Sequence, residues 1–289
     1  MNQDILTGLV RALETGDEVA LVTIVAARGS TPQRVGAKML VFADGRSIGT
    51  IGGGCYENDA ALKARAALTS RQAQLVNYDL ADDFVEESGL ICGGQMQVFI
   101  EPIESPPRLY VVGAGHVAQH LARSASQVGF RVSVVDDREK FANRERFPDA
   151  DTISVESIPD WLDGAALPPH AYVAIVTRGH RHDLSALRAL APRELRYVGL
   201  IGSKAKVSRI YAALLAEGVA PEALARVHAP IGLDIGAVTP EEIAASIVAE
   251  LVAVRRGRID DPHVNAATLK WKQWLALAER ERRPAAAQS

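Results

Sequence analysis

The sequence predicts an α/β protein in which a smaller N-terminal α+β domain precedes a larger parallel-sheet domain. Three observations support this. First, residues 109–138 have the pattern of a strand, a glycine turn, a helix and a second strand. Second, apolar strands alternate with helical patterns in the rest of the second half of the chain. Third, a proline-rich stretch, 101–108, separates this half from a shorter first part. These features predict a Rossmann-type C-terminal domain. We place the N-terminal domain at residues 1–106, the Rossmann-type domain at 107–258 and a polar tail at 259–289.

The first part of the chain alternates helical and strand patterns. Leu9 and Leu13 belong to a helical repeat that Gly16 ends, and an Ala-Asp-Gly turn joins two short strands as a hairpin. The predicted elements are a helix over 5–15, strands over 21–27, 37–42 and 46–51, a helix from about residue 57, and strands over 74–79 and 97–100. Such a mixture predicts an α+β domain whose exposed apolar strands favour a homodimer.

Both cysteines of the chain adjoin glycines. Gly52, Gly53 and Gly54 precede Cys55 at a predicted helix start, and Gly93 and Gly94 follow Cys92. Backbone amides at a helix start form an anion site, and the helix dipole there favours a thiolate. Two thiolates sharing one pocket could hold a soft metal such as molybdenum or copper, or carry sulfur as a persulfide. A buried structural role is the alternative for each cysteine.

The dinucleotide-binding turn is the clearest motif. The apolar strand Leu109–Val112 leads into Gly113-Ala114-Gly115-His116-Val117-Ala118, the G-x-G-x-x-A pattern. There, the first glycine permits a tight turn, the second admits a phosphate, and the small alanine lets the helix pack closely. Asp136 ends the next strand about 20 residues later, where an acid usually holds a ribose hydroxyl. His116 could reach a bound phosphate.

Polar residues follow two further predicted strands, 172–177 and 197–201. Because carboxyl ends of parallel strands meet at one sheet edge, we expect these residues near one ligand. They are His180, His182, Asp183, Lys204 and Lys206. The lysines could neutralise a phosphate or only form a solvated helix start.

The rest of the second half holds weaker patterns. Residues 141–169 read as irregular, and 227–239 as a glycine-rich loop. A helix begins at Thr239, a capping residue followed by proline and two glutamates, and it buries Ile243, Ile247 and Leu251. An amphipathic helix is predicted over 269–282.

Composition excludes several classes of protein. A formal net charge of −3 with mixed signs gives no nucleic-acid or anionic-membrane signature, and no apolar run reaches the roughly 18 residues of a membrane span. The first residues lack the basic region of a secretory signal. We therefore expect a cytoplasmic protein with free thiols.

Eight segments in order resemble one family. They are GSTPQRVGAKM, GTIGGGCYE, ICGGQMQVFIEP, VVGAGHVAQ, VVDDR, VTRGHRHD, YVGLIGSKAK and PIGLDIGAVTPEEIAASIVAELVAVRRG. The chain thus resembles the xanthine dehydrogenase accessory protein family, XdhC/CoxI, over about residues 5–258. The resemblance implies a non-catalytic chaperone that binds molybdenum cofactor (molybdopterin), holds it while a cysteine desulfurase or other sulfurtransferase supplies its terminal sulfur, and delivers it to xanthine dehydrogenase or a related molybdenum hydroxylase. It also places Cys55 and Cys92 in the family's two Gly-Cys motifs.

A second function remains open from the residues alone. An NAD(P)-dependent oxidoreductase would use Asp136 for the ribose and His180 as acid–base. Both readings could hold if the Rossmann crevice takes the nucleotide of a dinucleotide form of the cofactor.

Overall fold

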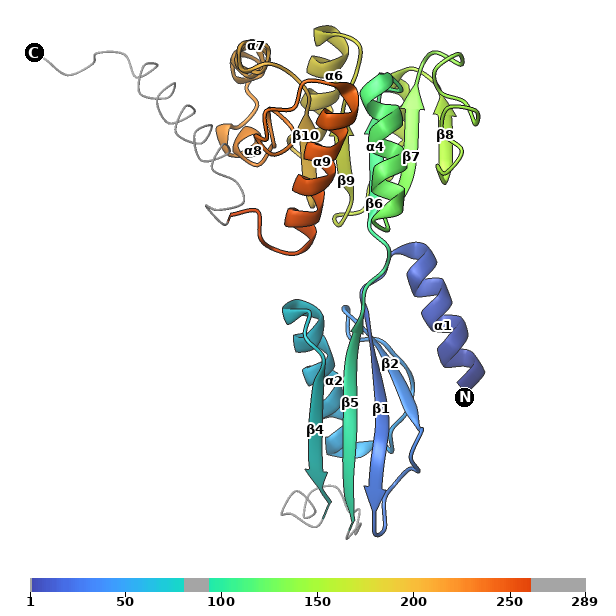
Figure 1. Cartoon of the computed structure of the whole chain (residues 1–289). Helices are drawn as coiled ribbons and strands as arrows, with labels where there is room; N and C mark the ends of the chain where they lie inside the picture. The colour runs from blue at the N-terminus through green and yellow to red at the C-terminus, as the bar shows by residue number, and fades with distance from the viewer. Residues whose placement is uncertain (1, 81–93, 261–289) are drawn as a thin grey trace, which may run out of the picture. The chain divides into compact units, whose positions relative to one another are not determined.

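The computed structural model describes residues 2–80 and 94–260. The chain divides between Pro106 and Pro107 into two compact units. The first is built on a five-stranded antiparallel sheet and the second on a five-stranded parallel sheet (Figure 1). The predicted α/β fold class is therefore confirmed. Within the described ranges, no helix combines the length and the apolar character that a membrane span requires.

The first unit carries a helix on each face of its sheet. In β1, Ala20 and Val22 pack in the cluster that contains the α2 residue Ala64, whereas Val19 lies in the cluster of the α1 residue Ile5. Alternate residues of a strand point to opposite faces, so β1 is buried from both sides. The elements are α1 (Asn2–Thr15), β1 (Val19–Arg28), β2 (Lys38–Phe42), β3 (Ser47–Gly49), α2 (Gly54–Ser70), β4 (Gln74–Asp79) and β5 (Gln95–Ile103), with strand order β3-β2-β1-β5-β4.

The second unit is a Rossmann-type sheet in the order β10-β9-β6-β7-β8. The order reverses between β6 and β9, the switch point beside which open α/β sheets bind ligands. The elements are β6 (Arg108–Val112), α4 (His116–Gln127), β7 (Arg131–Asp136), β8 (Thr152–Val155), α5 (Ile158–Gly164), β9 (Tyr172–Ile175), α6 (His180–Leu190), β10 (Tyr197–Leu200), α7 (Lys204–Ala216), α8 (Pro221–Ala225) and α9 (Pro240–Arg255).

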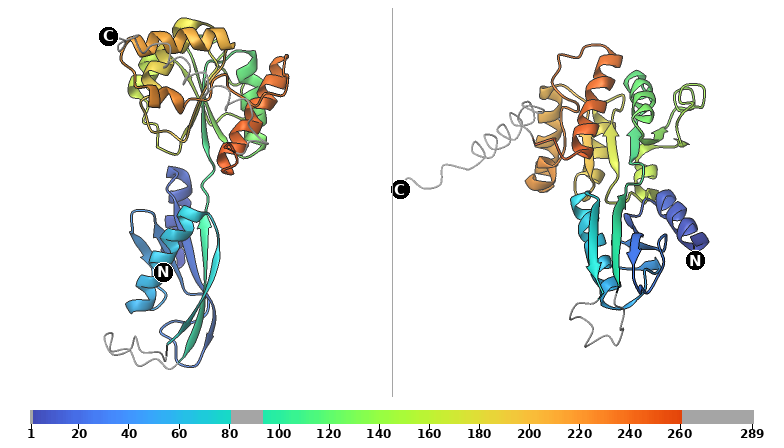
Figure 2. Two further views of the ribbon diagram at one scale, coloured as in Figure 1. Left: turned by 90° about the vertical axis from the view of Figure 1, so that its left-hand side faces the viewer. Right: turned by 60° about the horizontal axis from the view of Figure 1, so that its bottom comes forward.

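Helices cover both faces of this parallel sheet (Figure 2). Helices α4 and α9 share one core, in which Ala118 and Ala122 meet Ile247 and Leu251. Helices α5, α6 and α7 line the core of the other face. Small alanines on α4 permit its close approach, as the turn motif predicts.

The stretch 141–169, expected to be irregular, contains β8 and α5. Helix α5 has a recognisable start, because the Ser157 side chain accepts a 3.3 Å hydrogen bond from the Asp160 amide and Pro159 occupies the first turn. Helix α2 begins at Gly54, three residues earlier than expected, and β5 extends to Ile103 within the proline-rich stretch. The helix predicted over 269–282 lies outside the described residues.

Candidate functional site

The predicted site residues fall into two regions, one in each unit. We call the first the cysteine end: Cys55, the turn 50–54, the loop 28–34 and the chain at Leu80 and Gly94. We call the second the carboxyl edge: the residues that directly follow β6, β7, β9 and β10.

At the cysteine end, a carboxylate of the chain occupies the predicted anion site. Glu57 Oε2 accepts hydrogen bonds from the amides of Ile51 at 2.9 Å, Gly52 at 3.2 Å and Gly53 at 2.9 Å, and from the Thr50 hydroxyl. Partial burial raises the pKa of Glu57, but these hydrogen bonds outweigh burial and leave the pKa below its usual value. A phosphate would have to displace this carboxylate.

The glycines of this turn serve its shape. Gly52 and Gly53 have φ of 134° and 77°, and a Cβ on Gly52 would lie 2.5 Å from Pro32 Cβ. Glycine is therefore required where the turn crosses the loop 28–34. Cys55, the second residue of α2, is exposed directly after this turn.

The second Gly-Cys motif is described only in part. Cys92 and Gly93 lie outside the described residues, whereas Gly94 is buried. The Leu80 amide donates to the Gly94 carbonyl at 2.8 Å, and a Cβ on Gly94 would lie 2.6 Å from the Arg28 carbonyl oxygen. The chain on either side of Cys92 is thus joined beside the loop 28–34, the same loop that packs on Gly52.

Helix α2 is also tied to this place. The Tyr56 hydroxyl donates to the Asp79 carbonyl at 3.2 Å, and the Tyr56 ring meets Tyr78 edge-on at 5.5 Å between centroids. The residue after Cys55 therefore contacts the strand end that leads toward Cys92. Among the described residues, no three His, Cys, Asp or Glu side chains are grouped closely enough to hold a metal ion.

The dinucleotide turn opens the carboxyl edge. Gly113 has φ of 106°, and a Cβ there would lie 2.7 Å from the Val176 carbonyl oxygen, so glycine lets the turn after β6 pass the end of β9. Gly115 faces open space, since a Cβ there would meet nothing within 4 Å. Helix α4 has no side-chain cap and no acid in its first turn, and its first residue, His116, is exposed. This helix start remains available to an anion.

Asp136, the predicted ribose ligand, is fully engaged within the chain. Its Oδ1 accepts from the Arg138 amide at 3.0 Å and from Nε at 2.8 Å; its Oδ2 accepts from the Ala114 amide at 2.8 Å and from Arg138 Nη2 at 2.9 Å. Burial raises the pKa of Asp136, but the Arg138 and Ala114 hydrogen bonds outweigh it and lower the pKa to about 2. A carboxylate has about four acceptor positions, so none remains for a ribose hydroxyl.

Other charged side chains near Asp136, at the end of β7, are also paired within the chain. Arg178 Nη2 lies 2.8 Å from Asp137 Oδ2, which joins the end of β9 to the end of β7. The Arg138 guanidinium lies 3.9 Å above the Phe141 ring. The half of the edge where a dinucleotide fold places its adenosine therefore holds a buried pair, Asp136 with Arg138, beside a more exposed pair, Asp137 with Arg178.

At the ends of β9 and β10, the predicted polar residues separate into two kinds. His180 is exposed at the start of α6, whereas Asp183 has no exposed surface. Asp183 accepts from the Thr177 hydroxyl at 2.7 Å and lies 2.5 Å from Lys206 Nζ, so it links α6 to α7. Asp183 and Lys206 therefore act as a structural pair.

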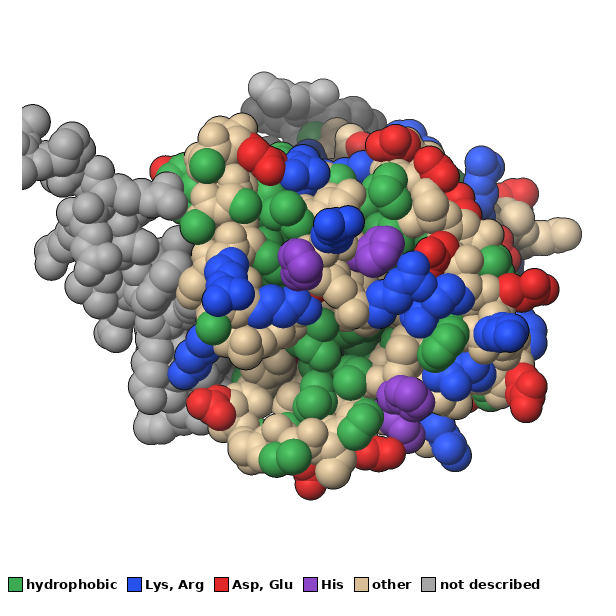
Figure 3. All heavy atoms as spheres, turned by 90° about the horizontal axis from the view of Figure 1, so that it is seen from above, with side chains coloured by type: hydrophobic (Ala, Val, Ile, Leu, Met, Phe, Trp, Pro, Cys, Tyr) green, Lys and Arg blue, Asp and Glu red, His purple; other side chains and the backbone are tan. Residues whose placement is uncertain are grey.

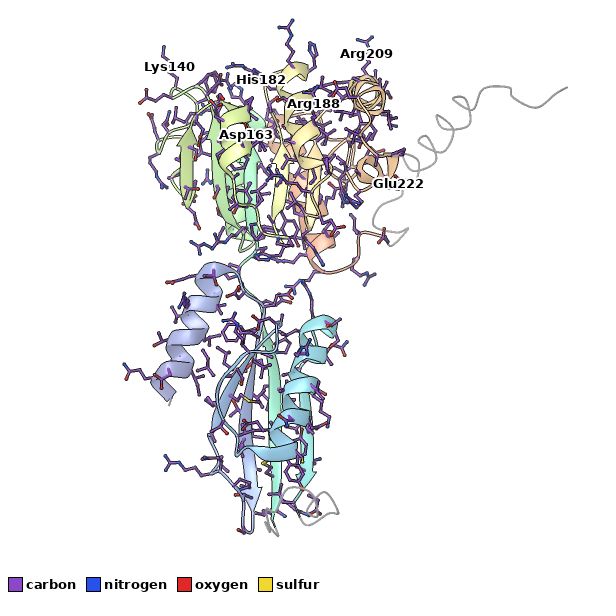
Figure 4. All side chains as sticks on the ribbon, turned by 180° about the vertical axis from the view of Figure 1, so that it is seen from behind. Lys140, Asp163, His182, Arg188, Arg209 and Glu222 are labelled. Carbon is purple, nitrogen blue, oxygen red and sulfur yellow. The ribbon has the colours of Figure 1, made fainter. Side chains whose placement is uncertain are left out.

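The remaining charge at this edge is mostly positive. Figure 3 looks onto the edge and shows Lys, Arg and His side chains gathered around an apolar hollow. In Figure 4, His182 and Arg209 lie at this edge, which is well separated from Glu222. A basic rim favours an anionic ligand.

Sequence reasoning missed a cavity beside β10. It has a volume of 660 Å³ and is lined by residues 201–204 and Ser208 around the start of α7, the loop 229–237, and Ile243 and Ser246 of α9. We call it the β10 cavity. The loop was recognisable only as a glycine-rich connection, although the segments YVGLIGSKAK and PIGLDIGAV both line the cavity.

Comparison with known proteins gives consistent matches. A family model described as the XdhC Rossmann domain matches residues 109–251, and one described as the XdhC and CoxI family matches residues 12–79. The uncharacterized protein YqeB of Escherichia coli is 38% identical over 87% of this chain, which spans only 46% of YqeB.

Two other relatives are matched over nearly their whole length. A Bacillus subtilis protein named as a probable subunit of xanthine dehydrogenase is 28% identical over 86% of this chain and 97% of its own. The molybdenum cofactor insertion chaperone PaoD of Escherichia coli is 26% identical over 90% of this chain and 91% of its own. Because XdhC models match both units in chain order, this protein belongs to the XdhC and CoxI family.

Proposed function

We propose that this chain is a chaperone that binds molybdenum cofactor and inserts it into a xanthine dehydrogenase or a related molybdenum hydroxylase. The name of PaoD supports the cargo, and the name of the Bacillus subtilis relative supports the kind of partner. In this proposal the chain catalyses no reaction itself, works in the cytoplasm as a homodimer, and holds the cofactor while a cysteine desulfurase or sulfurtransferase supplies its sulfur.

The observation that carries the proposal is the exposed Cys55 thiol on a turn built to present it. Three amides and the Thr50 hydroxyl fix Glu57, and two glycines in left-handed conformation bring the turn against Pro32. A thiolate is a soft ligand that suits molybdenum. We propose that Cys55 contacts the metal, with Cys92 of the second Gly-Cys motif as its partner.

Taken by itself, the carboxyl edge of the second unit is proposed as a separate candidate site for an anionic group of the cargo. Gly115 leaves open space at the start of α4, and His116 and His180 are exposed beside the two strands that flank the switch point. The proposal assigns no direct contact to Asp136 and Asp183, because each is buried and paired within the chain.

An NAD(P)-dependent oxidoreductase is supported less well. The dinucleotide turn favours it, but Asp136 has no acceptor position free for a ribose. A titration with NAD would separate the two functions, because tight NAD binding that Asp136→Ala abolishes, without affinity for the cofactor, would favour the oxidoreductase.

The proposal is tested by anaerobic binding of molybdenum cofactor to the wild type, Cys55→Ala and Thr69→Ala. Thr69 is exposed in the last turn of the same helix and serves as the control. We expect Cys55→Ala to weaken binding on the order of 100-fold, about 2.8 kcal/mol, and Thr69→Ala to leave it unchanged. Equal binding by all three proteins would refute the role of Cys55, and no binding by any would refute the chaperone function.

A further inference from the structure

We infer that the β10 cavity binds a fused 2-amino-4-oxopyrimidine ring, the ring system that pterins share with guanine, and that Lys204 contributes its charge to the phosphate site proposed above for the carboxyl edge. This inference rests on the proposed function for the choice of cargo. It deepens that function by naming the part of the cofactor that the second unit holds.

The dimensions and walls of the cavity suit a small molecule that carries a flat ring. Its 660 Å³ falls within the roughly 300–1,000 Å³ of small-molecule sites. Aliphatic side chains line most of it, from the end of β10, from the loop 229–237 and from α9; they include Ile201, Ile231, Leu233 and Ile243. Apolar walls with few polar groups favour a flat ring whose edge carries the specificity.

Two charged side chains supply those polar groups. Asp234 lies in the loop and Lys204 is the first residue of α7, so the two come from different walls. Both side chains are exposed, and within the described parts of the chain neither makes an ion pair or a hydrogen bond. A carboxylate can accept two parallel hydrogen bonds from the ring N–H and the exocyclic amine of a 2-amino-4-oxopyrimidine, an edge that adenine lacks. The lysine ammonium suits a phosphate.

A buried network holds the loop wall in place. Glu250 Oε2 accepts from the Tyr197 hydroxyl at 2.5 Å and from the Gly232 amide at 2.8 Å, and Glu250 Oε1 lies 3.0 Å from His228 Nδ1. Burial first, and then the Glu250 charge, raises the pKa of Tyr197 well above its usual value, so its hydroxyl remains a donor. The cavity is therefore formed before a ligand arrives.

Backbone contacts fix the same loop from two sides. The Leu200 amide donates to the His228 carbonyl at 2.9 Å, and the Ile231 amide donates to the Leu200 carbonyl at 2.9 Å. Gly232, with φ of 93°, crosses α9 where a Cβ would meet Ser246. The loop thus continues the sheet edge as a rigid wall.

The position of the cavity predicts a ligand with one ring. Dinucleotide folds hold one nucleotide on each side of the switch point. Here Arg138 and the Ala114 amide take the acceptor positions of Asp136 on the β7 side, whereas the β10 side carries the cavity. We therefore expect a single heterocycle with one phosphate to bind better than a dinucleotide.

The test measures by calorimetry the affinity of the full chain for four metal-free probes, which are neopterin monophosphate, GMP, AMP and NAD. We expect neopterin monophosphate and GMP to bind, and AMP and NAD to bind at least about 10-fold more weakly. Asp234→Asn and Lys204→Ala should each weaken the binding of neopterin monophosphate about 10-fold. The matched controls are Asp163→Asn and Lys140→Ala, exposed residues of the same unit whose charge changes are identical.

The outcomes separate this inference from the proposed function. Equal binding of AMP, or no effect of either cavity variant, would overturn the assignment of the ring and of Lys204. Absence of neopterin monophosphate binding, in a chain that binds molybdenum cofactor through Cys55, would overturn the cavity alone. If the chain binds neopterin monophosphate but Cys55→Ala leaves its affinity for molybdenum cofactor unchanged, the role of Cys55 is overturned and the cavity assignment stands.

Discussion

Two glycine-rich turns open helices in this protein, and the chain uses them in opposite ways. In the turn before α2, the amides of Ile51, Gly52 and Gly53 are bound by Glu57. In the turn before α4, no acid lies in the first turn and Gly115 faces open space. The first turn is closed to anions and presents a thiol, whereas the second remains open to them.

The difference lies in which carboxylate can reach the turn. Glu57 follows the glycines by three residues and folds back over them. The corresponding acid at the second turn, Asp136, comes from the next strand and binds the Ala114 amide, on the strand side of the turn. A glycine run at a helix start therefore indicates available amides only when no nearby acid of the chain can take them.

The largest expected effect separates the two glycines of the α4 turn. Gly113→Ala should destabilise the second unit by about 3 kcal/mol, because φ is 106° and the new Cβ would lie 2.7 Å from the Val176 carbonyl oxygen. Gly115→Ala, in open space with φ of −69°, should change stability by less than about 0.5 kcal/mol. Urea unfolding of both variants measures the difference, and equal losses would contradict the role given to Gly113.

The second prediction concerns the closed turn. Glu57→Ala should destabilise the first unit by about 2 kcal/mol, since three amides and a hydroxyl lose a charged acceptor. The folded pKa of Glu57 is depressed, so its stabilisation is present above the usual value of 4.5 and is lost as the pH falls below it.

Thermal unfolding at pH 7 and at pH 3 provides the measurement. Asn58→Ala, at the exposed next position, is the control and should match the wild type at both pH values. If Glu57→Ala is equally destabilising at pH 3, the ionised carboxylate is not the group that holds the turn.

Features that depend on residues close together in the chain could be predicted from the sequence, whereas features that depend on distant residues could not. The strand–turn–helix pattern at 109–118 and the helix capped by Thr239 depend on neighbouring residues, and both were predicted correctly. Helix α5 was missed although Ser157 and Pro159 mark its start, because the acidic residues around it obscured a seven-residue element.

The site was less accessible to prediction, because partners distant in the chain decide which groups remain free. Asp183 reads as a polar residue at a strand end, yet Lys206 and Thr177 bury and bind it. Lys204, two positions from Lys206, remains unpaired among the described residues and faces the β10 cavity. No local pattern distinguishes these two lysines, since the distinction depends on how α6 and α7 pack.

The third prediction tests whether Asp136 is structural. Its folded pKa of about 2 lies below the usual 3.8, so its ionised form contributes about 2 kcal/mol above pH 4, and this is lost as the pH falls toward 2. Asp136→Asn should therefore be less stable than the wild type at pH 7, with a difference that shrinks between pH 4 and 2. Denaturant unfolding across this range measures it, and a constant difference would contradict the ion pair with Arg138.

The smallest expected effect comes from a pair with similar geometry and a different environment. Arg188 Nε and Nη2 lie 2.6 and 2.7 Å from the two Glu217 oxygens, as bidentate as Arg138 on Asp136. Both Arg188 and Glu217 are exposed, so water replaces the interaction at little cost. Arg188→Ala should leave the melting temperature unchanged, and a loss as large as that of Asp136→Asn would show that burial does not govern these pairs. The stability of the Asp136–Arg138 pair also bears on the candidate site. The β7 half of the carboxyl edge is closed to a ribose only if this pair persists when a ligand approaches.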